Sequence, residues 1–251
     1  MRWNVRSLPE IPTRNDLVLL IDALGLRRGV EIGVNTGDFS QHILSKSGLE
    51  WLGSVDGWTT ETDDTRSVFR KWAIRNEAVE KAYRETVSKL SRFGARSSVI
   101  RKLSFDAVKE FADGSLDFIY VDASHRFSGV AMDLIQWWPK LREGGVFAGH
   151  DYWRAWRCEV MEVVNGFSVE NKQVLHLTTR DLNNRGKGKY PPTWWVVRES
   201  LSKDEWIRCV VAAKDELLAA QAAIRAKGVD VILPYQYHEQ WGMAASSGDA
   251  V

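Results

Sequence analysis

Four polar residues follow two apolar runs of the sequence and could share one chemical task. In "LDFIYVDASH", Asp122 follows a strand-like run and His125 lies three residues later. In "GGVFAGHDYW", the adjacent residues His150 and Asp151 follow a second such run. If the two runs are neighbouring parallel strands, about 4.8 Å apart, carboxylates at both tips can reach one cation. Helix capping is the alternative role for such residues. Their gathering at one edge favours a functional cluster.

The two histidines suit acid–base chemistry. Imidazole titrates near neutral pH and can therefore take a proton from a hydroxyl group that acts as a nucleophile. We expect His125 to be the base, with His150 as the second candidate.

A second polar region lies nearer the N-terminus, in "VEIGVNTGDFS". The spacing Glu31-x-Gly33-x-x-x-Gly37 predicts a tight turn from a strand into a helix, where a ligand can approach the backbone. The stretch lacks the G-x-G-x-x-G pattern of nicotinamide-binding proteins. Asp56 ends the next predicted strand, where a carboxylate can accept hydrogen bonds from ribose hydroxyls.

Short apolar runs alternate with longer helical patterns along the chain, which is typical of a parallel sheet with helices on both faces. The predicted strands are residues 29–34, 51–58, 98–103, 116–122, 144–153, 174–178 and 193–197. The predicted helices include residues 15–26, a long helix ending near Leu90, and residues 105–111, 128–141, 159–166 and 204–226.

Residues 29–197 resemble the class I S-adenosylmethionine-dependent methyltransferases. The resemblance implies an α/β fold with a Rossmann-like, seven-stranded, mostly parallel sheet, helices on both faces and an antiparallel last strand. It assigns cofactor binding to the first motif and to positions at later strand ends. The residues so assigned are Glu31, Gly33, Asn35, Gly37, Asp56, Ser104, Phe105 and Asp122, with Ser104 and Phe105 beside the adenine.

The segment from Leu116 to Trp153 is similar to catechol- and caffeoyl-type metal-dependent O-methyltransferases, and more closely to bacterial small-molecule and sugar O-methyltransferases. This resemblance implies a divalent metal held by Asp122, His150 and Asp151, and a base at His125. Imidazole suits manganese, iron or zinc better than magnesium. Successive strand residues also point to opposite faces of the sheet, which disfavours the binding of one ion by both His150 and Asp151.

Bulk properties indicate a single domain that binds a small molecule. The 251 residues are 44% hydrophobic and 27% charged, with a formal net charge of +1. We expect an N-terminal helical cap (1–27), a core (28–200) and a C-terminal helix and tail (201–251). With no basic tract, apolar span or leader-like stretch, we expect no nucleic-acid or membrane partner and a cytoplasmic location. Only two cysteines are present, which disfavours a disulfide framework.

The sequence therefore predicts a methyltransferase that uses S-adenosylmethionine, assisted by magnesium or manganese, to methylate a hydroxyl of a small acceptor such as a sugar, phenol or natural product. A metal-independent O- or N-methyltransferase, a non-catalytic protein that retains the sheet and, more remotely, a nicotinamide-dependent enzyme are the alternatives. A homo-oligomer could form through Leu217, Ala220 and Ile224 of the C-terminal helix.

Overall fold

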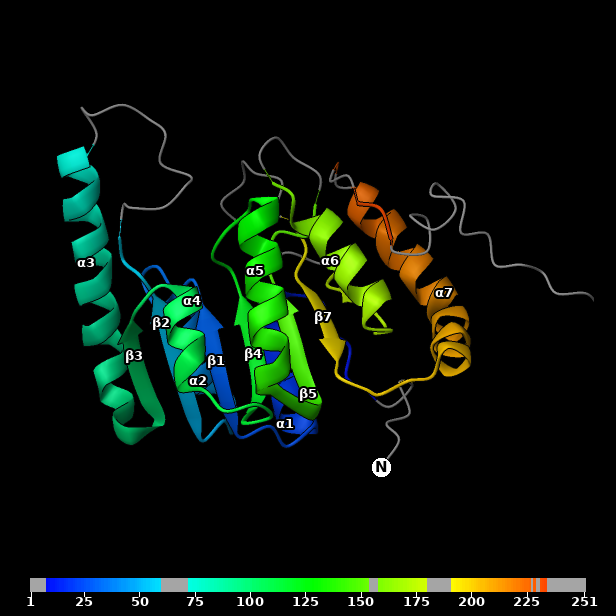
Figure 1. Ribbon diagram of the computed structural model, residues 1–251, viewed down its shortest axis with the longest axis horizontal. Helices are drawn as coiled ribbons and strands as arrows, with labels where there is room; N and C mark the ends of the chain where they lie inside the picture. The colour runs from blue at the N-terminus through cyan, green and yellow to red at the C-terminus, as the bar shows by residue number, and fades with distance from the viewer. Residues whose placement is uncertain are drawn as a thin grey trace, which may run out of the picture.

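The computed structural model describes residues 8–59, 72–153, 158–179, 191–226, 228 and 231–233. In this part of the chain, helices cover both faces of one twisted sheet (Figure 1). The strands are β1 (Arg28–Ile32), β2 (Trp51–Asp56), β3 (Ser97–Arg101), β4 (Leu116–Val121), β5 (Leu141–Gly149), β6 (His176–Leu177) and β7 (Trp194–Val197). The helices are α1 (Leu17–Ala23), α2 (Asp38–Lys46), α3 (Trp72–Leu90), α4 (Ser104–Ala107), α5 (Phe127–Trp137), α6 (Val160–Glu170) and α7 (Lys203–Ala226).

The sheet has the order β3-β2-β1-β4-β5-β7-β6. Strands β1 to β5 are parallel, and β7 runs antiparallel to both of its neighbours, β5 and β6. The predicted seven-stranded, mostly parallel sheet with an antiparallel last strand is therefore confirmed. Because β1 and β4 are neighbours at the point where the strand order reverses, their carboxyl ends border the crevice in which such sheets bind ligands.

Two apolar cores fix the helices to the sheet. On one face, α1 and α2 bury Leu17, Leu20 and Ile43 against Phe118. On the other face, α5 and α6 pack against the sheet and lie in front of it in Figure 1, and α7 joins the same core and contacts β6. Trp137 is fully buried in this second core. Each helix places one apolar stripe on the sheet, as the sequence periodicity predicted.

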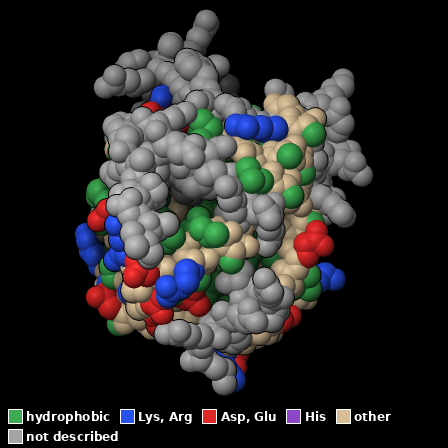
Figure 2. Space-filling view, turned by 90° about the vertical axis from the view of Figure 1, so that its right-hand side faces the viewer, with side chains coloured by type: hydrophobic (Ala, Val, Ile, Leu, Met, Phe, Trp, Pro, Cys, Tyr) green, Lys and Arg blue, Asp and Glu red, His purple; other side chains and the backbone are tan. Residues whose placement is uncertain are grey.

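Helix α7 packs against its own domain through residues that the sequence suggested for subunit docking. Ala220 and Ile224 are 7% and 4% exposed, so the docking hypothesis is wrong for these two; the side chain of Leu217 lies outside the described residues. Ile207 and Val211 are the exposed apolar residues of this helix, with Leu218 beyond them. Figure 2 shows the described hydrophobic side chains in separate groups on this side of the molecule. Among the described helices, none combines the length and apolarity needed to cross a membrane.

His176 in β6 is a titratable group inside the sheet. Its ring stacks on Trp195 of β7, with centroids 4.0 Å apart and planes 12° apart. Burial lowers the pKa of His176 from 6.5 to about 4. The neutral imidazole is therefore part of the folded structure.

We expect His176 to make the protein sensitive to acid. Below pH 6.5 the unfolded chain protonates this histidine but the folded chain does not, so its stabilisation is present above pH 6.5 and is lost as the pH falls towards 4. Urea unfolding should show that His176→Phe reduces the fall in unfolding free energy over this range, by up to about 1.4 kcal/mol per pH unit. Equal slopes for the wild type and the variant would contradict this.

Candidate functional site

The loop between β1 and α2 needs both of its predicted glycines. Gly33 and Gly37 have φ angles of +88° and +75°, in the region that side chains disfavour. A Cβ at Gly33 would lie 2.2 Å from the carbonyl oxygen of Asp122. Gly37 is the N-cap of α2, and a Cβ there would meet Thr86 at 3.0 Å. The first motif thus lets β1 turn sharply while touching β4 and α3.

Asp56 braces this loop from the end of β2. Its Oδ2 accepts hydrogen bonds from the backbone N–H groups of Val34 and Asn35, both at 2.9 Å, and its Oδ1 accepts one from Trp58 at 2.8 Å. On the other side, Lys89 of α3 donates to the carbonyl oxygen of Thr36 at 2.6 Å. Sequence analysis missed this bracing role. A carboxylate has about four acceptor positions, so contact with a ribose hydroxyl stays compatible with it.

Glu31 lies beneath the loop in a buried polar cluster. Its carboxyl accepts a hydrogen bond from Ser40, whose hydroxyl is 2.7 Å from that of Ser54. Burial raises the pKa of Glu31 to about 8, against the effect of Ser40. Asp122 and Asp56 add to this increase by repulsion. Glu31 therefore lies within electrostatic reach of both polar regions that the sequence singled out.

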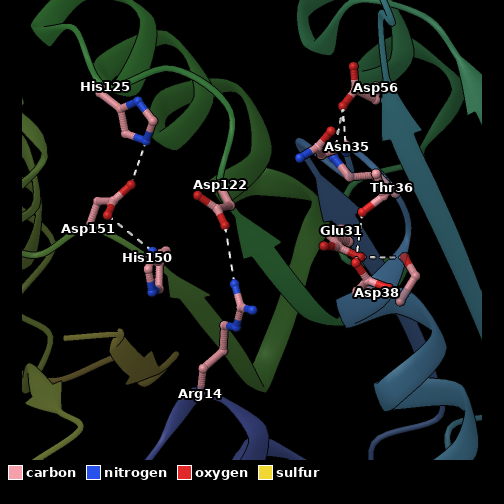
Figure 3. Close-up of polar contacts among 12 residues, drawn as sticks. Arg14, Glu31, Asn35, Thr36, Asp38, Asp56, Asp122, His125, His150 and Asp151 are labelled. Carbon is pink, nitrogen blue, oxygen red and sulfur yellow. Dashed lines mark hydrogen bonds and ion pairs between the residues drawn. The ribbon is translucent and has the colours of Figure 1, made fainter. Parts of the chain in front are cut away.

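Three of the predicted residues converge after β4 and β5. Asp122, His125 and Asp151 offer ligand atoms that all lie within 4.8 Å of one another. His125 Nε2 is 2.5 Å from Asp151 Oδ2. Figure 3 shows His125 and His150 approaching Asp151 from opposite sides, with Asp122 next to them. Asp151 reaches this place because its φ of +57° turns the chain sharply after the strand.

The charges of this group depend on one another. Burial would raise the pKa of Asp151, but the hydrogen bonds from His125 and His150 outweigh it and hold that pKa far below its usual range. Asp122 behaves differently, since burial raises its pKa to about 6 despite the nearby His150. Burial also opposes charge on His150, but Asp151 and Asp122 outweigh it and raise its pKa. Asp151 is thus the most strongly ionised carboxylate of the group.

His150 does not join the group that the structure brings together. Its Nδ1 is 3.1 Å from Asp151 Oδ1, and its ring lies apart from the His125 side of that carboxylate. His150 continues the alternation of β5 and shares a sheet face with Ala148, whereas Asp151 turns away. The residues whose possible ligand atoms lie within 4.8 Å of one another are thus Asp122, His125 and Asp151, and the predicted ligand role of His150 stays a prediction.

The residues predicted to lie beside the adenine have other contacts. Ser104 donates a hydrogen bond to Asp133 of α5 and accepts one from Trp137 Nε1 at 2.8 Å. Its hydroxyl thus joins α4 to α5. Phe105 is 47% exposed. A role for Ser104 and Phe105 at the cofactor stays a prediction, and the hydroxyl of Ser104 does not favour it.

Aromatic residues near the candidate site are packing residues. Tyr152 is fully buried and donates to Asn165 Oδ1 at 2.6 Å, and Trp58 packs on Tyr83 of α3. Trp153 packs partly buried against the core of the α5 face.

Arg14 is a site residue that sequence analysis missed. It precedes α1, and its Nη1 lies 3.6 Å from Asp122 Oδ2. Burial opposes its charge, but Tyr120 and Asp122 outweigh it and raise the pKa of Arg14. The capping pattern Thr13-x-x-Asp16, in which Thr13 Oγ1 donates to Asp16 at 2.6 Å, could have marked the start of a helix here. It gives no sign of what Arg14 faces.

Known proteins are similar to this chain in sequence and in fold. Residues 30–152 match the family model described as a methyltransferase domain. The fold is similar to the O-methyltransferase from Bacillus cereus solved in complex with SAH (16% identity, 77% of this chain and 84% of that one, TM-score 0.52). It is also similar to the O-methyltransferase TomG from Streptomyces achromogenes, involved in tomaymycin synthesis and solved with SAM (13% identity, 76% and 82%, TM-score 0.51).

One curated protein is similar to part of the chain. An uncharacterized protein of Sinorhizobium fredii (strain NBRC 101917 / NGR234) is 27% identical over 154 residues, which are 60% of this chain but 15% of that protein. The chain thus spans only a small part of the length of this relative. The structural similarities establish the fold, and the domain match confirms the resemblance on which the site residues were chosen.

Removing the Ser104 hydroxyl tests its packing role. Ser104→Ala leaves the buried Asp133 and the Trp137 N–H without this partner, so we expect a loss of about 1–3 kcal/mol of unfolding free energy. Chemical denaturation measures it. A variant as stable as the wild type would show that the hydroxyl is not part of the α4–α5 contact.

Proposed function

We propose, from the premise that residues 30–152 form a class I S-adenosylmethionine-dependent methyltransferase domain, that this chain transfers a methyl group from S-adenosylmethionine to a hydroxyl oxygen of a small molecule. One observation carries the proposal. The braced glycine loop and the Asp122–His125–Asp151 group lie at the same edge of the sheet, on opposite sides of the junction between β1 and β4. A cofactor and an acceptor held there would lie side by side.

The residues present fit S-adenosylmethionine. Its sulfonium and ammonium groups are cationic, and Glu31, Asp56 and Asp122 make this part of the edge acidic. The same carboxyl groups disfavour a pyrophosphate, which argues against a nicotinamide cofactor. Asp56 would hold the ribose and the 33–37 loop would cover the amino-acid part. The solved relatives described with SAH or SAM support this assignment by their fold.

The residues also fit a divalent cation. Asp122 and Asp151 supply carboxylate oxygens and His125 an imidazole nitrogen, and the ionised state of Asp151 suits a ligand. A mixed oxygen and nitrogen set favours manganese, iron or zinc over magnesium. When bound, the cation would stabilise negative charge that develops on an acceptor hydroxyl.

The chain itself contributes position and a proton acceptor. Hydrogen bonds with Asp56, Thr86 and Lys89 would fix the loop that contacts the cofactor. This matters because alignment of the reacting atoms supplies much of the acceleration in a methyl transfer. His125 can take the proton from the acceptor hydroxyl at Nδ1, because its Nε2–H faces Asp151 Oδ2. Asp151 beside it stabilises the charged imidazolium that results.

This last contact favours a second candidate function. His125 and Asp151 resemble a base and the carboxylate that orients it, an arrangement that works without any cation. In that case the chain is a metal-independent O- or N-methyltransferase that uses the same cofactor site. The two candidates differ in their response to chelation.

The acceptor that we propose is a small hydroxylated molecule such as a sugar, a phenol or a natural product. The formal net charge of +1 and the absence of a basic tract in the sequence give no electrostatic reason for a nucleic-acid partner. A homo-oligomer is compatible with the exposed apolar residues of α7.

Cofactor binding is the first test. Calorimetric titration should show that S-adenosylhomocysteine binds the wild type and that Asp56→Ala weakens it about tenfold or more, because the ribose contacts and the loop brace are both lost. Asp113→Ala is the control, since Asp113 lies on the opposite edge and pairs with Lys140. No binding to the wild type would overturn the proposed function.

Metal binding separates the two candidates. Manganese should bind the wild type, and Asp151→Asn should weaken it about tenfold or more, as titration followed by electron paramagnetic resonance would measure. Methyl transfer to a panel of hydroxylated acceptors should stop with EDTA and return with manganese. Activity that survives EDTA but is lost in His125→Ala would select the metal-independent candidate.

A further inference from the structure

Arg14 reaches the site from a rigid part of the N-terminal segment. The turn that contains it is fixed by Asp16, which accepts hydrogen bonds from the N–H and hydroxyl groups of Thr13 at 3.0 and 2.6 Å. Directly afterwards, Leu17 and Leu20 of α1 are completely buried against the sheet. Figure 3 shows the guanidinium pointing up towards Asp122. The fold therefore delivers a permanent cation to the β1–β4 junction.

The contacts of Arg14 are loose for a structural ion pair. Its Nη1 is 3.6 Å from Asp122 Oδ2, which is longer than a hydrogen bond, and its Cζ lies 4.8 Å from the centre of the Phe39 ring. The side chain is 35% exposed. A planar group with five N–H donors is thus held in place by a ring while its accessible part faces the site.

Two buried hydroxyl groups lie on the same face of the sheet. Tyr120 precedes Asp122 by two residues in β4, and Thr193 precedes Trp195 by two residues at the start of β7. Tyr120 is completely buried and Thr193 is 1% exposed. Neither Tyr120 Oη nor Thr193 Oγ1 has a partner in good hydrogen-bond geometry within the described ranges, although the Tyr120 hydroxyl lies close enough to Thr193 and to Arg14 for side-chain contacts that shift the pKa of Tyr120 and of Arg14. Buried hydroxyls without partners are costly unless a ligand uses them.

We infer that Arg14, Tyr120 and Thr193 form a subsite that binds a carboxylate group of a ligand, with Arg14 as the charged anchor and the two hydroxyls as further donors. A planar guanidinium matches a carboxylate in shape and charge. The subsite lies on the α1 side of Asp122, whereas His125 lies after Asp122 towards α5. It is thus separate from the candidate metal group although it borders it.

Two ligands can supply the carboxylate, and the inference rests on the proposed function for both. One is S-adenosylmethionine, whose amino-acid end carries an ammonium as well; Glu31 and Asp122, both within electrostatic reach of Arg14, are the complementary acids. The other is an acidic acceptor. The position of Arg14 over Phe39 of α2 favours the cofactor.

Two nucleosides that differ in this group test the subsite. S-adenosylhomocysteine carries the amino-acid carboxylate and 5′-methylthioadenosine lacks it. In calorimetric titration, Arg14→Gln should weaken S-adenosylhomocysteine about 10- to 100-fold and change 5′-methylthioadenosine less than about twofold. Tyr120→Phe should weaken the first ligand several-fold and leave 5′-methylthioadenosine within about twofold, with a melting temperature close to that of the wild type, since the hydroxyl makes no hydrogen bond of good geometry.

Controls and alternative outcomes are distinct. Arg27→Gln is the matched variant, because Arg27 pairs with Glu50 at 2.6 Å before β1, away from the site, and it should bind both nucleosides like the wild type. Arg14→Lys keeps the positive charge but loses the planar guanidinium group, so its affinity for S-adenosylhomocysteine should lie between those of Arg14→Gln and the wild type. Circular dichroism establishes that each variant is folded.

The acceptor as the source gives a different pattern. The affinity for S-adenosylhomocysteine would then be the same in Arg14→Gln and in the wild type. The wild type saturated with S-adenosylhomocysteine would bind 3,4-dihydroxybenzoate more tightly than catechol, and Arg14→Gln would lose this preference. Equal effects on both nucleosides, or no effect on nucleosides and no loss of such a preference, would overturn the subsite. Failure of the wild type to bind either nucleoside would instead overturn the proposed function, and the subsite with it.

Discussion

The close approach of β1 to β4 at Gly33 is the constraint on which the site depends. The N–H of Asp122 donates to the carbonyl oxygen of Ile32 at 2.8 Å, and the N–H of Gly33 donates to Val55 of β2 at 2.9 Å. Any side chain at position 33 would collide with the Asp122 backbone. This contact joins the loop that would hold the cofactor to the residue that leads into the Asp122–His125–Asp151 group. A shift at this point would change the alignment of the two halves of the site, on which the proposed methyl transfer depends.

From Asp122 the polar residues spread towards two sides of the sheet, because strand residues alternate. Tyr120, His150 and Thr193 belong to the α1 side, where Arg14 enters, and Asp151 leaves β5 with a left-handed backbone towards His125. Asp151 is therefore the link between the sides, since both histidines donate to its carboxylate. The side chains of the adjacent residues His150 and Asp151 therefore point to different sides of the sheet.

The fold and the edge that carries the site were predictable from the sequence, and the individual contacts were not. Alternating apolar runs identified the strands, and the ends of β4 and β5 correctly placed Asp122 and Asp151 together, because parallel neighbours end at one edge. The proximity of His125 to Asp151 was not predicted, because the positive φ of Asp151 has no reliable signature in a non-glycine residue. The contact of Arg14 with Asp122 could not be predicted, because the two residues are 108 positions apart and the pattern around Arg14 indicates only the start of a helix.

The acidity of the site explains why its parts differ in charge. Burial and repulsion by Asp122 raise the pKa of Glu31, and burial and repulsion by Asp151 raise that of Asp122. Arg14 relieves part of that repulsion, and the hydroxyl of Ser40, which also contacts the hydroxyl of Ser54, donates to the Glu31 carboxyl. Asp151 escapes the same penalty because two imidazoles surround it. A ligand that brings its own positive charges to the Glu31 side and a carboxylate to the Arg14 side would complete this balance, and a sulfonium amino acid has both.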